Sequence, residues 1–269
     1  MPSNLITPSE LSTDLGNFVV CDVRWKLDDP DHGQRSYEEG HIPGARRVDL
    51  DADLSGPPGP QGRHPLPRPE KFAEALGRLG ITPRDAVVIY DDAAGRIAAR
   101  MWWMLQAIGH KDARVLDGGI QQWIAADLPT SREVESLTPT LYPAPGGFDG
   151  VVEIDDLTER RVIDAREPER YLGLAEPVDP VAGHIPGAIN IPSSSTIENG
   201  RLKGPADLRS LYEDLENPVV SCGSGVVACH SALAMTEDGL AMRDVYIGAY
   251  SEEERSGGAV ETDTGTGAI

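Results

Sequence analysis

Two sequence motifs occur twice in this 269-residue chain, at almost the same distance from one another each time. Residues 19–24 read Val-Val-Cys-Asp-Val-Arg, and residues 161–166 read Arg-Val-Ile-Asp-Ala-Arg. Gly-His-Ile-Pro-Gly-Ala follows each of them, at 40–45 and at 183–188. The aspartates of the first motif are 142 residues apart and the histidines of the second are 143 apart, so both motifs repeat in one register. A repeat of this length is too long for a solenoid unit and predicts two similar domains.

Short apolar runs rich in β-branched residues alternate with helical stretches in both halves. In the first half, the run 86–90 precedes a helical stretch over 97–109. In the second half, the run 218–221 precedes a helical stretch that ends near Gly239. Strands that alternate with helices are typical of parallel βα units. We therefore expect an α/β protein of two tandem domains, each an open parallel sheet flanked by helices.

Changes in composition predict where these domains begin and end. Residues 5–127 are expected to form the N-terminal domain, and residues 151–256 the C-terminal domain. Between them, residues 128–150 are rich in Pro, Gly and Thr and are interpreted as a linker. Residues 257–269 are rich in Gly and Thr and are expected to be a disordered tail.

Acidic residues outnumber basic ones by 44 to 24, which gives a formal net charge of −20. Such a charge argues against an electrostatic role on nucleic acid or on an anionic membrane. No apolar run approaches the ~18 residues that indicate a membrane span. The N-terminus lacks the basic and apolar regions of a secretory signal. We therefore expect a cytoplasmic protein with no nucleic-acid or membrane partner.

The three cysteines, Cys21, Cys222 and Cys229, form neither a disulfide framework nor a zinc-binding pattern. We expect reduced thiols and neither a metal nor an organic cofactor. Cys21 lies in an apolar strand run and is interpreted as a core residue. Cys229, seven residues after Cys222, is interpreted as a packing residue, with a resolving thiol as the alternative.

Cys222 follows an apolar strand and opens the sequence Cys-Gly-Ser-Gly-Val-Val-Ala directly before a helix. Ligands in open α/β sheets bind beyond the carboxyl ends of the strands. Gly223 and Gly225 allow consecutive N–H groups to turn inward into an anion-binding nest, and the helix adds its positive N-terminal end. Both effects would stabilise a thiolate or the terminal sulfur of a persulfide. The alternative is a buried cysteine that ends a core strand.

Several motifs together resemble the tandem rhodanese family of sulfurtransferases. They are Gly-His-Ile-Pro-Gly-Ala in both halves, Asp-Val-Arg-Trp at 22–25, Leu-Asp-Gly-Gly at 116–119 and Asp-Ala-Arg at 164–166. The resemblance covers the chain to about residue 255. It implies two rhodanese-like domains, of which the second carries the catalytic cysteine and the first is a non-catalytic copy. Residues 90–93 agree with this, because they stand where the second half has its cysteine loop and contain no cysteine.

The resemblance implies sulfur transfer in two steps. The Cys222 thiolate would take a sulfane sulfur from a small anionic donor, as a persulfide, and pass it to a thiol, cyanide or protein acceptor. Thiosulfate-using members commonly have a basic residue beside the cysteine, whereas Gly223 and Ser224 are neutral. The loop is similar to Cys-Gly-Ser-Gly-Val-Thr-Ala of mercaptopyruvate-type members. We therefore expect 3-mercaptopyruvate as the donor in preference to thiosulfate.

Substrate-binding residues are implied by the same resemblance. Within the loop they are Gly223, Gly225, Val226 and Val227, of which Val227 replaces the threonine of mercaptopyruvate-type members. Arg170 matches an arginine that holds the substrate carboxylate, for which a guanidinium is well suited. A second family arginine, expected after Glu-Pro, is missing, because this stretch reads Val178-Asp179-Pro180.

A Ser-His-Asp relay assists sulfur transfer in mercaptopyruvate-type members. Asp51, His64 and Ser224 match its three positions. A histidine held by a carboxylate can pass a proton through a hydroxyl group to a departing enolate. We therefore expect Cys222, Ser224, His64 and Asp51 to be the catalytic residues. Without the resemblance, His64 would be interpreted as a solvent-exposed loop histidine. Arg24 and Arg166 are interpreted as structural ion-pair residues, and the histidines of the repeated motif as scaffold residues.

Three other functions are considered. Thiosulfate:cyanide sulfurtransferase is the alternative within the same family. A persulfide-binding or regulatory module without turnover is compatible with Val227 and the missing second arginine. A cysteine phosphatase shares this fold but needs an arginine six residues after the cysteine, where this chain has Ala228.

Overall fold

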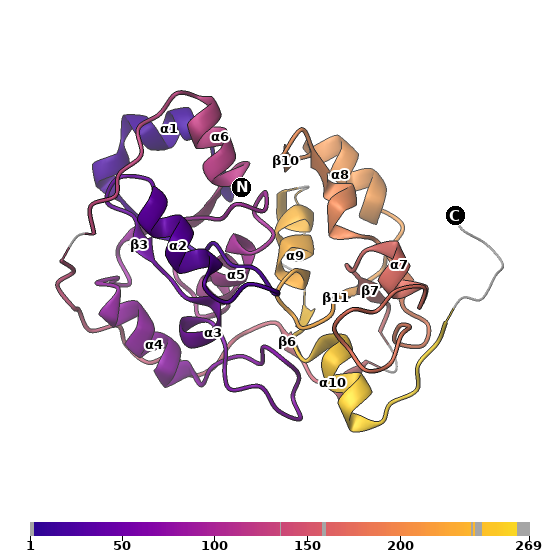
Figure 1. Cartoon of the computed structure of the whole chain (residues 1–269). Coiled ribbons are helices and arrows are strands. Elements are labelled where there is room, and N and C mark those ends of the chain that lie inside the picture. The colour runs from indigo at the N-terminus through magenta and orange to yellow at the C-terminus, as the bar shows by residue number, and fades with distance from the viewer. Residues whose placement is uncertain (1–2, 135, 158–159, 238, 240–243, 263–269) are drawn as a thin grey trace. The chain divides into compact units, whose positions relative to one another are not determined.

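The computed structural model describes residues 3–134, 136–157, 160–237, 239 and 244–262. The chain forms two compact units, and each takes a short segment from the part of the sequence that mainly builds the other (Figure 1). The first unit comprises Met1–Gly56, Leu66–Asp149 and Ile197–Leu202, and the second comprises Pro57–Pro65, Gly150–Thr196 and Lys203–Ile269. The segment Pro57–Pro65, called here the 57–65 loop, therefore belongs to the second unit although it lies early in the sequence.

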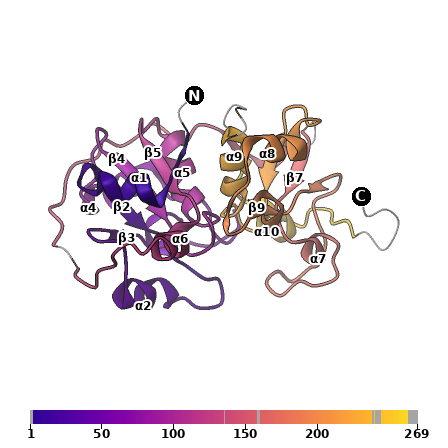
Figure 2. The same ribbon diagram turned by 90° about the horizontal axis from the view of Figure 1, so that it is seen from above.

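The first unit is built on a parallel sheet with the strand order β1-β5-β4-β2-β3. Its strands are β1 (Leu5–Ile6), β2 (Phe18–Asp22), β3 (Arg46–Arg47), β4 (Ala86–Tyr90) and β5 (Ala113–Leu116). Helices flank the sheet (Figure 2): α1 (Pro8–Thr13), α2 (His32–Glu39), α3 (Leu50–Asp53), α4 (Pro69–Arg78), α5 (Ala98–Ala107) and α6 (Gly119–Ala125). A short antiparallel hairpin of β9 (Ile197–Glu198) and β10 (Arg201–Leu202) completes this unit.

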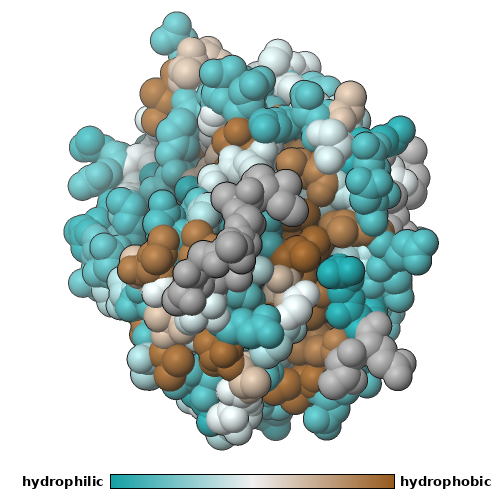
Figure 3. Space-filling view, turned by 90° about the vertical axis from the view of Figure 1, so that its right-hand side faces the viewer, coloured by the Kyte–Doolittle hydropathy of each residue, from teal (hydrophilic) through white to brown (hydrophobic). Residues whose placement is uncertain are grey.

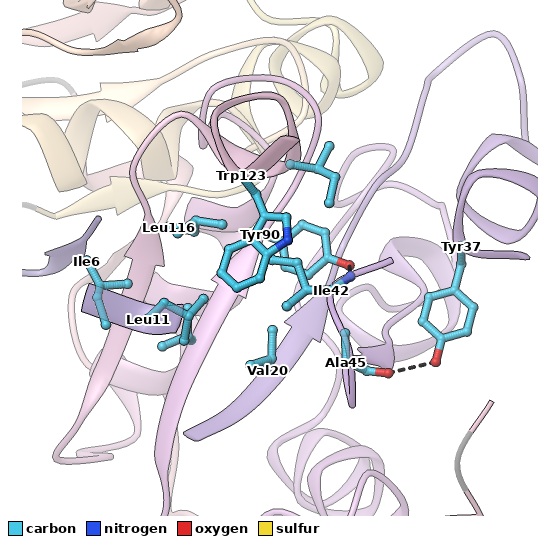
Figure 4. Close-up of a cluster of buried hydrophobic side chains, with 11 residues drawn as sticks. Ile6, Leu11, Val20, Tyr37, Ile42, Ala45, Tyr90, Leu116 and Trp123 are labelled. Carbon is cyan, nitrogen blue, oxygen red and sulfur yellow. Dashed lines mark hydrogen bonds between the residues drawn. The ribbon is translucent and has the colours of Figure 1, made fainter. Parts of the chain in front are cut away.

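Side chains from the sheet and the surrounding helices form one apolar cluster in the first unit (Figure 4). The cluster includes Ile6, Leu11, Val20, Ile42, Tyr90, Leu116 and Trp123, all of which are buried. Burying an apolar side chain of this kind stabilises the folded state by about 1.5–3 kcal/mol. Tyr37 adds a polar contact at the edge of the cluster, where its hydroxyl group donates to the carbonyl oxygen of Ala45 at 2.6 Å.

The second unit repeats this topology with the strand order β6-β12-β11-β7-β8, again parallel throughout. Its strands are β6 (Val151–Val152), β7 (Val162–Asp164), β8 (Ile189–Asn190), β11 (Val219–Ser221) and β12 (Val245–Tyr246). Its helices are α7 (Pro168–Tyr171), α8 (Pro205–Tyr212), α9 (Ala228–Glu237) and α10 (Ala249–Ser256). The predicted fold class, two tandem α/β domains with parallel sheets, is therefore confirmed.

The repeated motifs occupy matching places in the two units. Asp22 ends β2 and Asp164 ends β7, and each accepts a hydrogen bond from the arginine two residues later, Arg24 at 2.5 Å and Arg166 at 2.6 Å. Each arginine also donates to the carbonyl oxygen of the first glycine of the Gly-His-Ile-Pro-Gly-Ala motif. The motif histidines are buried, and each stacks on a tyrosine with ring centroids 3.8 Å apart. These residues hold the scaffold together, as the sequence predicts.

The segment expected to be a linker, residues 128–150, runs along the first unit for most of its length. Ser131 and His41 exchange two backbone hydrogen bonds of 2.8 and 2.9 Å, and the Thr140 N–H group donates to the Gly77 carbonyl oxygen at 2.8 Å. The first unit accordingly extends to Asp149. The linker therefore contributes to the structure of the first unit.

Part of the segment expected to be a disordered tail is held on the second unit. Glu261 and His184 exchange two backbone hydrogen bonds of 2.8 and 2.9 Å. The described part of the tail, residues 257–262, therefore has a defined place beside the motif histidine. The remaining tail residues, 263–269, lie outside the described residues.

Hydrophilic residues cover much of the surface seen in Figure 3, with apolar patches between them. The large apolar side chains that are exposed include Leu27, Ile124, Val134, Leu141, Leu174 and Val181. Exposed apolar residues of this kind are ordinary on a protein surface. Within the described ranges, no helix is long and apolar enough to cross a membrane.

Candidate active site

Cys222 lies directly after the carboxyl end of β11, and its loop leads into α9. Its side chain is buried, with 4 % of the residue exposed. The loop is fixed to the start of α10, because the Cys222 carbonyl oxygen accepts the Tyr250 N–H group and the Gly223 carbonyl oxygen accepts the Ser251 N–H group, both at 3.0 Å. The carboxyl end of the central strand β11 and the two helices therefore hold the cysteine in one place, where ligands of α/β sheets bind.

Gly225 is the residue on which the shape of this loop depends. Its backbone has a φ of +75°, a region that side chains other than glycine rarely adopt. A Cβ atom at this position would lie 2.3 Å from the Ile247 carbonyl oxygen. After this turn, Val226 is buried and Val227 half-buried, and their carbonyl oxygens accept the first backbone hydrogen bonds of α9. The loop thus wraps the N-terminal end of α9.

His64 belongs to the same unit as this loop and contacts it directly. Its Nδ1 atom lies 2.8 Å from Ser224 Oγ, within hydrogen-bond distance. Both residues are buried, His64 with 7 % and Ser224 with 9 % exposed. The alternative interpretation of His64 as a solvent-exposed loop histidine is therefore wrong. The structure brings together the histidine and the serine that the resemblance assigns to the relay.

Several contacts attach the 57–65 loop to α10. The Arg63 N–H group donates to Ser251 Oγ at 3.1 Å. Arg255 Nη1 donates to the carbonyl oxygens of Gly59 and Gly62, at 2.7 and 3.0 Å. These contacts explain how a segment early in the sequence becomes part of the second unit.

Asp51, the third predicted member of the relay, belongs to the first unit, in α3. Its carboxylate accepts a hydrogen bond from Trp25 Nε1 at 3.0 Å. The assignment of Asp51 as the partner of His64 stays a prediction.

Arg170, in α7, is held by two carboxylates. Its Nε and Nη2 atoms donate to Glu176 at 3.0 and 2.7 Å, and Nη2 also donates to Asp179 at 3.2 Å. Its Nη1 atom points to the cysteine loop, since it lies 3.3 Å from the place that a Cβ atom of Gly223 would occupy. The predicted substrate arginine therefore lies beside the residue that follows Cys222.

Arg63 also lies at this place, although sequence reasoning did not identify it. It forms an ion pair with Asp179, and its Nη2 atom lies 2.9 Å from the Cβ position of Gly223. Burial lowers the pKa of Arg63, and the charge of Arg170 acts in the same direction, whereas Asp179 and Cys222 oppose the shift. The available signal was its place next to His64, since a residue beside a relay histidine also lies close to the cysteine loop.

The pKa values of the two acidic residues in this cluster are shifted in opposite directions. Burial disfavours the charged form of Glu176, but hydrogen bonds from Arg170 and from the backbone N–H groups of Asp179 and Val178 outweigh it and lower its pKa. For Asp179, burial dominates and raises the pKa, although Arg63 opposes this. Two arginines and two carboxylates therefore form a compact ionic cluster beside Gly223.

The other two cysteines are packing residues. Cys21 is fully buried in β2, and burial raises the pKa of its thiol to about 12. Cys229 is fully buried in α9 and donates from Sγ to the Gly225 carbonyl oxygen at 3.3 Å. Neither is placed to act as a readily ionised, accessible thiol. In the part of the chain that the structure describes, no three His, Cys, Asp or Glu side chains group as metal ligands would.

Comparison with known proteins identifies both units. The model of the rhodanese-like domain matches residues 7–126 and again residues 152–252. A probable 3-mercaptopyruvate sulfurtransferase of Pseudomonas aeruginosa is 38% identical over 270 residues, which cover 93% of this chain and 94% of that protein. A putative thiosulfate sulfurtransferase of Mycobacterium tuberculosis is 38% identical over 267 residues, which cover 92% and 93%.

Solved structures give the same result. The 3-mercaptopyruvate sulfurtransferase from Leishmania major superimposes with a TM-score of 0.86 at 31% sequence identity, over 94% of this chain and 75% of that one. Both the sequence and the fold of this chain are thus similar to those of proteins that transfer sulfur.

Proposed function

Because the chain belongs to the rhodanese family and is a sulfurtransferase, we propose that it takes sulfur from 3-mercaptopyruvate and carries it as a persulfide on Cys222. The observation that carries this proposal is the placement of Cys222 at the end of β11, with the His64–Ser224 pair and Arg170 beside it. Relatives named as 3-mercaptopyruvate sulfurtransferases support the choice of donor.

In the loading step, the Cys222 thiolate attacks the thiol sulfur of 3-mercaptopyruvate. An S–S bond forms, the C–S bond breaks, and its electron pair stays on carbon as the enolate of pyruvate. The thiol proton of the donor is transferred to this carbon, so the products are pyruvate and the Cys222 persulfide anion. In the second step, cyanide or a thiol attacks the outer sulfur, and the Cys222 thiolate is released. Thiocyanate or a new persulfide leaves with the transferred sulfur.

The His64–Ser224 pair would move the proton in the loading step. A hydroxyl group within 2.8 Å of an imidazole nitrogen can relay a proton between that nitrogen and a bound substrate. The direction of the hydrogen bond depends on the tautomer of His64. Asp51 is the proposed carboxylate that orients this histidine.

The substrate would be held at both of its ends. Arg170 would bind the carboxylate, because a guanidinium offers paired donors to a carboxylate. Gly223, Gly225, Val226 and Val227 would surround the transferred sulfur and the resulting Cys222 persulfide with backbone N–H groups. The negative sulfur would then lie at the N-terminal end of α9, where the helix dipole favours an anion.

Thiosulfate is the second candidate donor, because a relative of 38% identity is named as a putative thiosulfate sulfurtransferase. We propose a thiol, cyanide or a protein as the sulfur acceptor. We also propose a cytoplasmic location, which agrees with three free cysteines, since the cytoplasm keeps thiols reduced.

Steady-state kinetics tests the proposed donor. The specificity constant kcat/KM of the parent protein is measured with 3-mercaptopyruvate and with thiosulfate, with cyanide as the acceptor. We expect a higher value for 3-mercaptopyruvate. An equal or higher value for thiosulfate would reverse the assignment of the donor. A single stoichiometric loading without turnover of either donor would identify a persulfide-binding module in place of an enzyme.

A further inference from the structure

We propose that Arg63 supplies the second guanidinium of the donor-binding site, and that Arg63 and Arg170 together bind the single carboxylate of the donor. This inference rests on the proposed function, because it concerns the donor from which Cys222 takes its sulfur. The resemblance leads us to expect a second arginine after Glu176-Pro177, where the chain has no arginine. Arg63 reaches the cysteine loop from the 57–65 loop instead.

The two guanidinium groups converge on one point. Arg63 Nη2 and Arg170 Nη1 lie 2.9 and 3.3 Å from the Cβ position of Gly223. Among the described residues, neither of these two nitrogens has a hydrogen-bond partner. Two donors directed at the residue after Cys222 are therefore available to an anion that is bound there.

Asp179 demonstrates that one carboxylate can span the two groups. One of its oxygens pairs with Arg63 Nη1, and the other accepts from Arg170 Nη2 at 3.2 Å. Glu176 holds the far edge of Arg170 through Nε and Nη2. The acidic residues thus fix both arginines and leave the N–H groups that face Gly223 for a ligand.

The charge balance of this cluster favours a donor with one negative charge at its binding end. Arg63 and Arg170 are matched by Glu176 and Asp179, so the four groups have no net charge when all are ionised. A neutral cluster offers well-directed hydrogen bonds but little net attraction for a dianion such as thiosulfate. Burial and the neighbouring Arg170 lower the pKa of Arg63, and a bound carboxylate would relieve this by adding a negative partner.

The same loop delivers the binding group and the proton relay. Arg63 directly precedes His64, and the Arg63 N–H group is attached to Ser251 in α10. The chain has Asp179 in the stretch where the second family arginine is expected, and this aspartate forms an ion pair with Arg63. The ion pair therefore holds the Arg63 guanidinium in the same stretch of the site.

Substitution of Arg63 by glutamine tests this role. We expect Arg63→Gln to raise the KM for 3-mercaptopyruvate, and the inhibition constant of the product pyruvate, by about 10- to 100-fold, as the loss of one charge-assisted contact implies. The kcat should change much less, because His64, Ser224 and Cys222 are retained. Arg63→Lys, which keeps the charge without the forked geometry, should give intermediate values. Thermal unfolding shows whether Arg63→Gln is folded. If it is not, the KM and the inhibition constant of Arg63→Lys test the role of Arg63.

Alkylation of Cys222 gives a second measurement that needs no turnover. The rate with iodoacetate, which has a carboxylate, is divided by the rate with neutral iodoacetamide. We expect this ratio to fall about 10-fold or more in Arg63→Gln. The matched control is Arg160→Gln. It removes an arginine of the same unit that pairs with Asp244 at 2.8 Å and lies before β7, at the opposite end of the strands.

The outcomes separate this inference from the proposed function. If both the KM and the alkylation ratio of Arg63→Gln match those of Arg160→Gln, the role of Arg63 is refuted, while Cys222 remains the sulfur carrier. A raised KM with an unchanged ratio also refutes it, because Arg63 would then only position the loop. If the parent protein turns over no donor but its ratio depends on Arg63, the carboxylate site stands and the proposed function fails.

Discussion

The loops that follow β4 and β11 lie at matching places in the two units, but only one begins with a cysteine. Tyr90, the last residue of β4, lies opposite Asp22 on the neighbouring strand β2. Ser221, the last residue of β11, lies opposite Asp164 on the neighbouring strand β7. The next residue is Asp91 in the first loop, whereas in the second it is the proposed sulfur carrier. The Asp91 carbonyl oxygen accepts the Ile120 N–H group of α6 at 2.9 Å, and the Cys222 carbonyl oxygen accepts the Tyr250 N–H group of α10 at 3.0 Å.

The first loop is filled by its own anion. The buried Asp91 carboxylate accepts hydrogen bonds of 2.7–2.9 Å from four backbone N–H groups, those of Ala93, Gly95, Ile97 and Ala98. A loop of this kind thus gathers N–H groups around a carboxylate, and these hydrogen bonds oppose the burial that raises the pKa of Asp91. In the second loop the equivalent residue is Cys222, and we infer that its thiolate or persulfide takes the place of that carboxylate. The first unit therefore has the fold of the second, but the N–H groups of its loop are already bound by a carboxylate of the chain itself.

Replacing the sulfur itself gives the largest effect. We expect Cys222→Ser to reduce sulfur transfer to the background rate, because a hydroxyl group cannot form the persulfide. Cys21→Ser and Cys229→Ser, which change buried packing thiols, should retain most of the activity. The measurement is the rate of thiocyanate formation. If Cys222→Ser were as active as the parent, the loop after β11 would not carry the sulfur, and the proposed difference between the two loops would be wrong.

The histidine partner of each loop gives the next effect. His64 contacts Ser224 in the second loop, and His32 contacts Asp92 in the first at 2.6 Å. We expect His64→Ala to lower kcat by about 10²- to 10⁴-fold, the usual range for a general acid–base group. His32→Ala should leave kcat close to that of the parent. Equal kcat values for the two variants would remove the relay assignment.

The buried carboxylate of the first loop should matter for stability alone. Asp91→Ala leaves four N–H groups without their acceptor, so we expect a loss of about 3–5 kcal/mol in the free energy of unfolding. At temperatures where the variant remains folded, its kcat should be close to that of the parent. Urea unfolding measures the first quantity and a turnover assay the second. A loss below 1 kcal/mol would show that the cradle does not need an anion.

A smaller effect on stability is expected at the fourth residue of each loop, where the backbone has a left-handed conformation. It is Ala94 in the first loop, with a φ of +57°, and Gly225 in the second, with a φ of +75°. We expect Gly225→Ala to cost about 1–3 kcal/mol for its backbone conformation, and its Cβ contact with Ile247 places the cost at the upper end. Ala94→Gly should change stability by less than about 1 kcal/mol. Equal urea midpoints for the two variants would contradict this account of the loops.

Features encoded in contiguous residues could be predicted from the sequence. The repeated motifs, the alternation of strands and helices, and the loop after Val219–Ser221 each lie within a short stretch, so their local structure follows from local composition. The parallel sheets and the scaffold role of Arg24 and Arg166 agree with this. The position of Cys222 at a strand end follows for the same reason.

Features that depend on distant contacts have no local sequence signal, and only the family resemblance indicated one of them, the approach of His64 to Ser224. Arg63 and His64 belong to the second unit because α10, almost 190 residues later, holds their loop. The sequence has no local signal for that contact. The role of Arg63 was missed because the expected arginine position has Asp179, and only the folded structure shows that the two form an ion pair. Likewise, Glu261 in the expected tail finds its partner His184 far away in sequence.

The central claim is that the loop after β11 carries the transferred sulfur. The most direct measurement is to incubate the parent protein with 3-mercaptopyruvate without an acceptor, block all thiols and persulfides by alkylation, and map the modified peptides by mass spectrometry. We expect the mass of one additional sulfur atom on the peptide that contains Cys222, and its loss after cyanide is added. Additional sulfur on Cys21 or Cys229, or turnover without any sulfur added to Cys222, would contradict the claim.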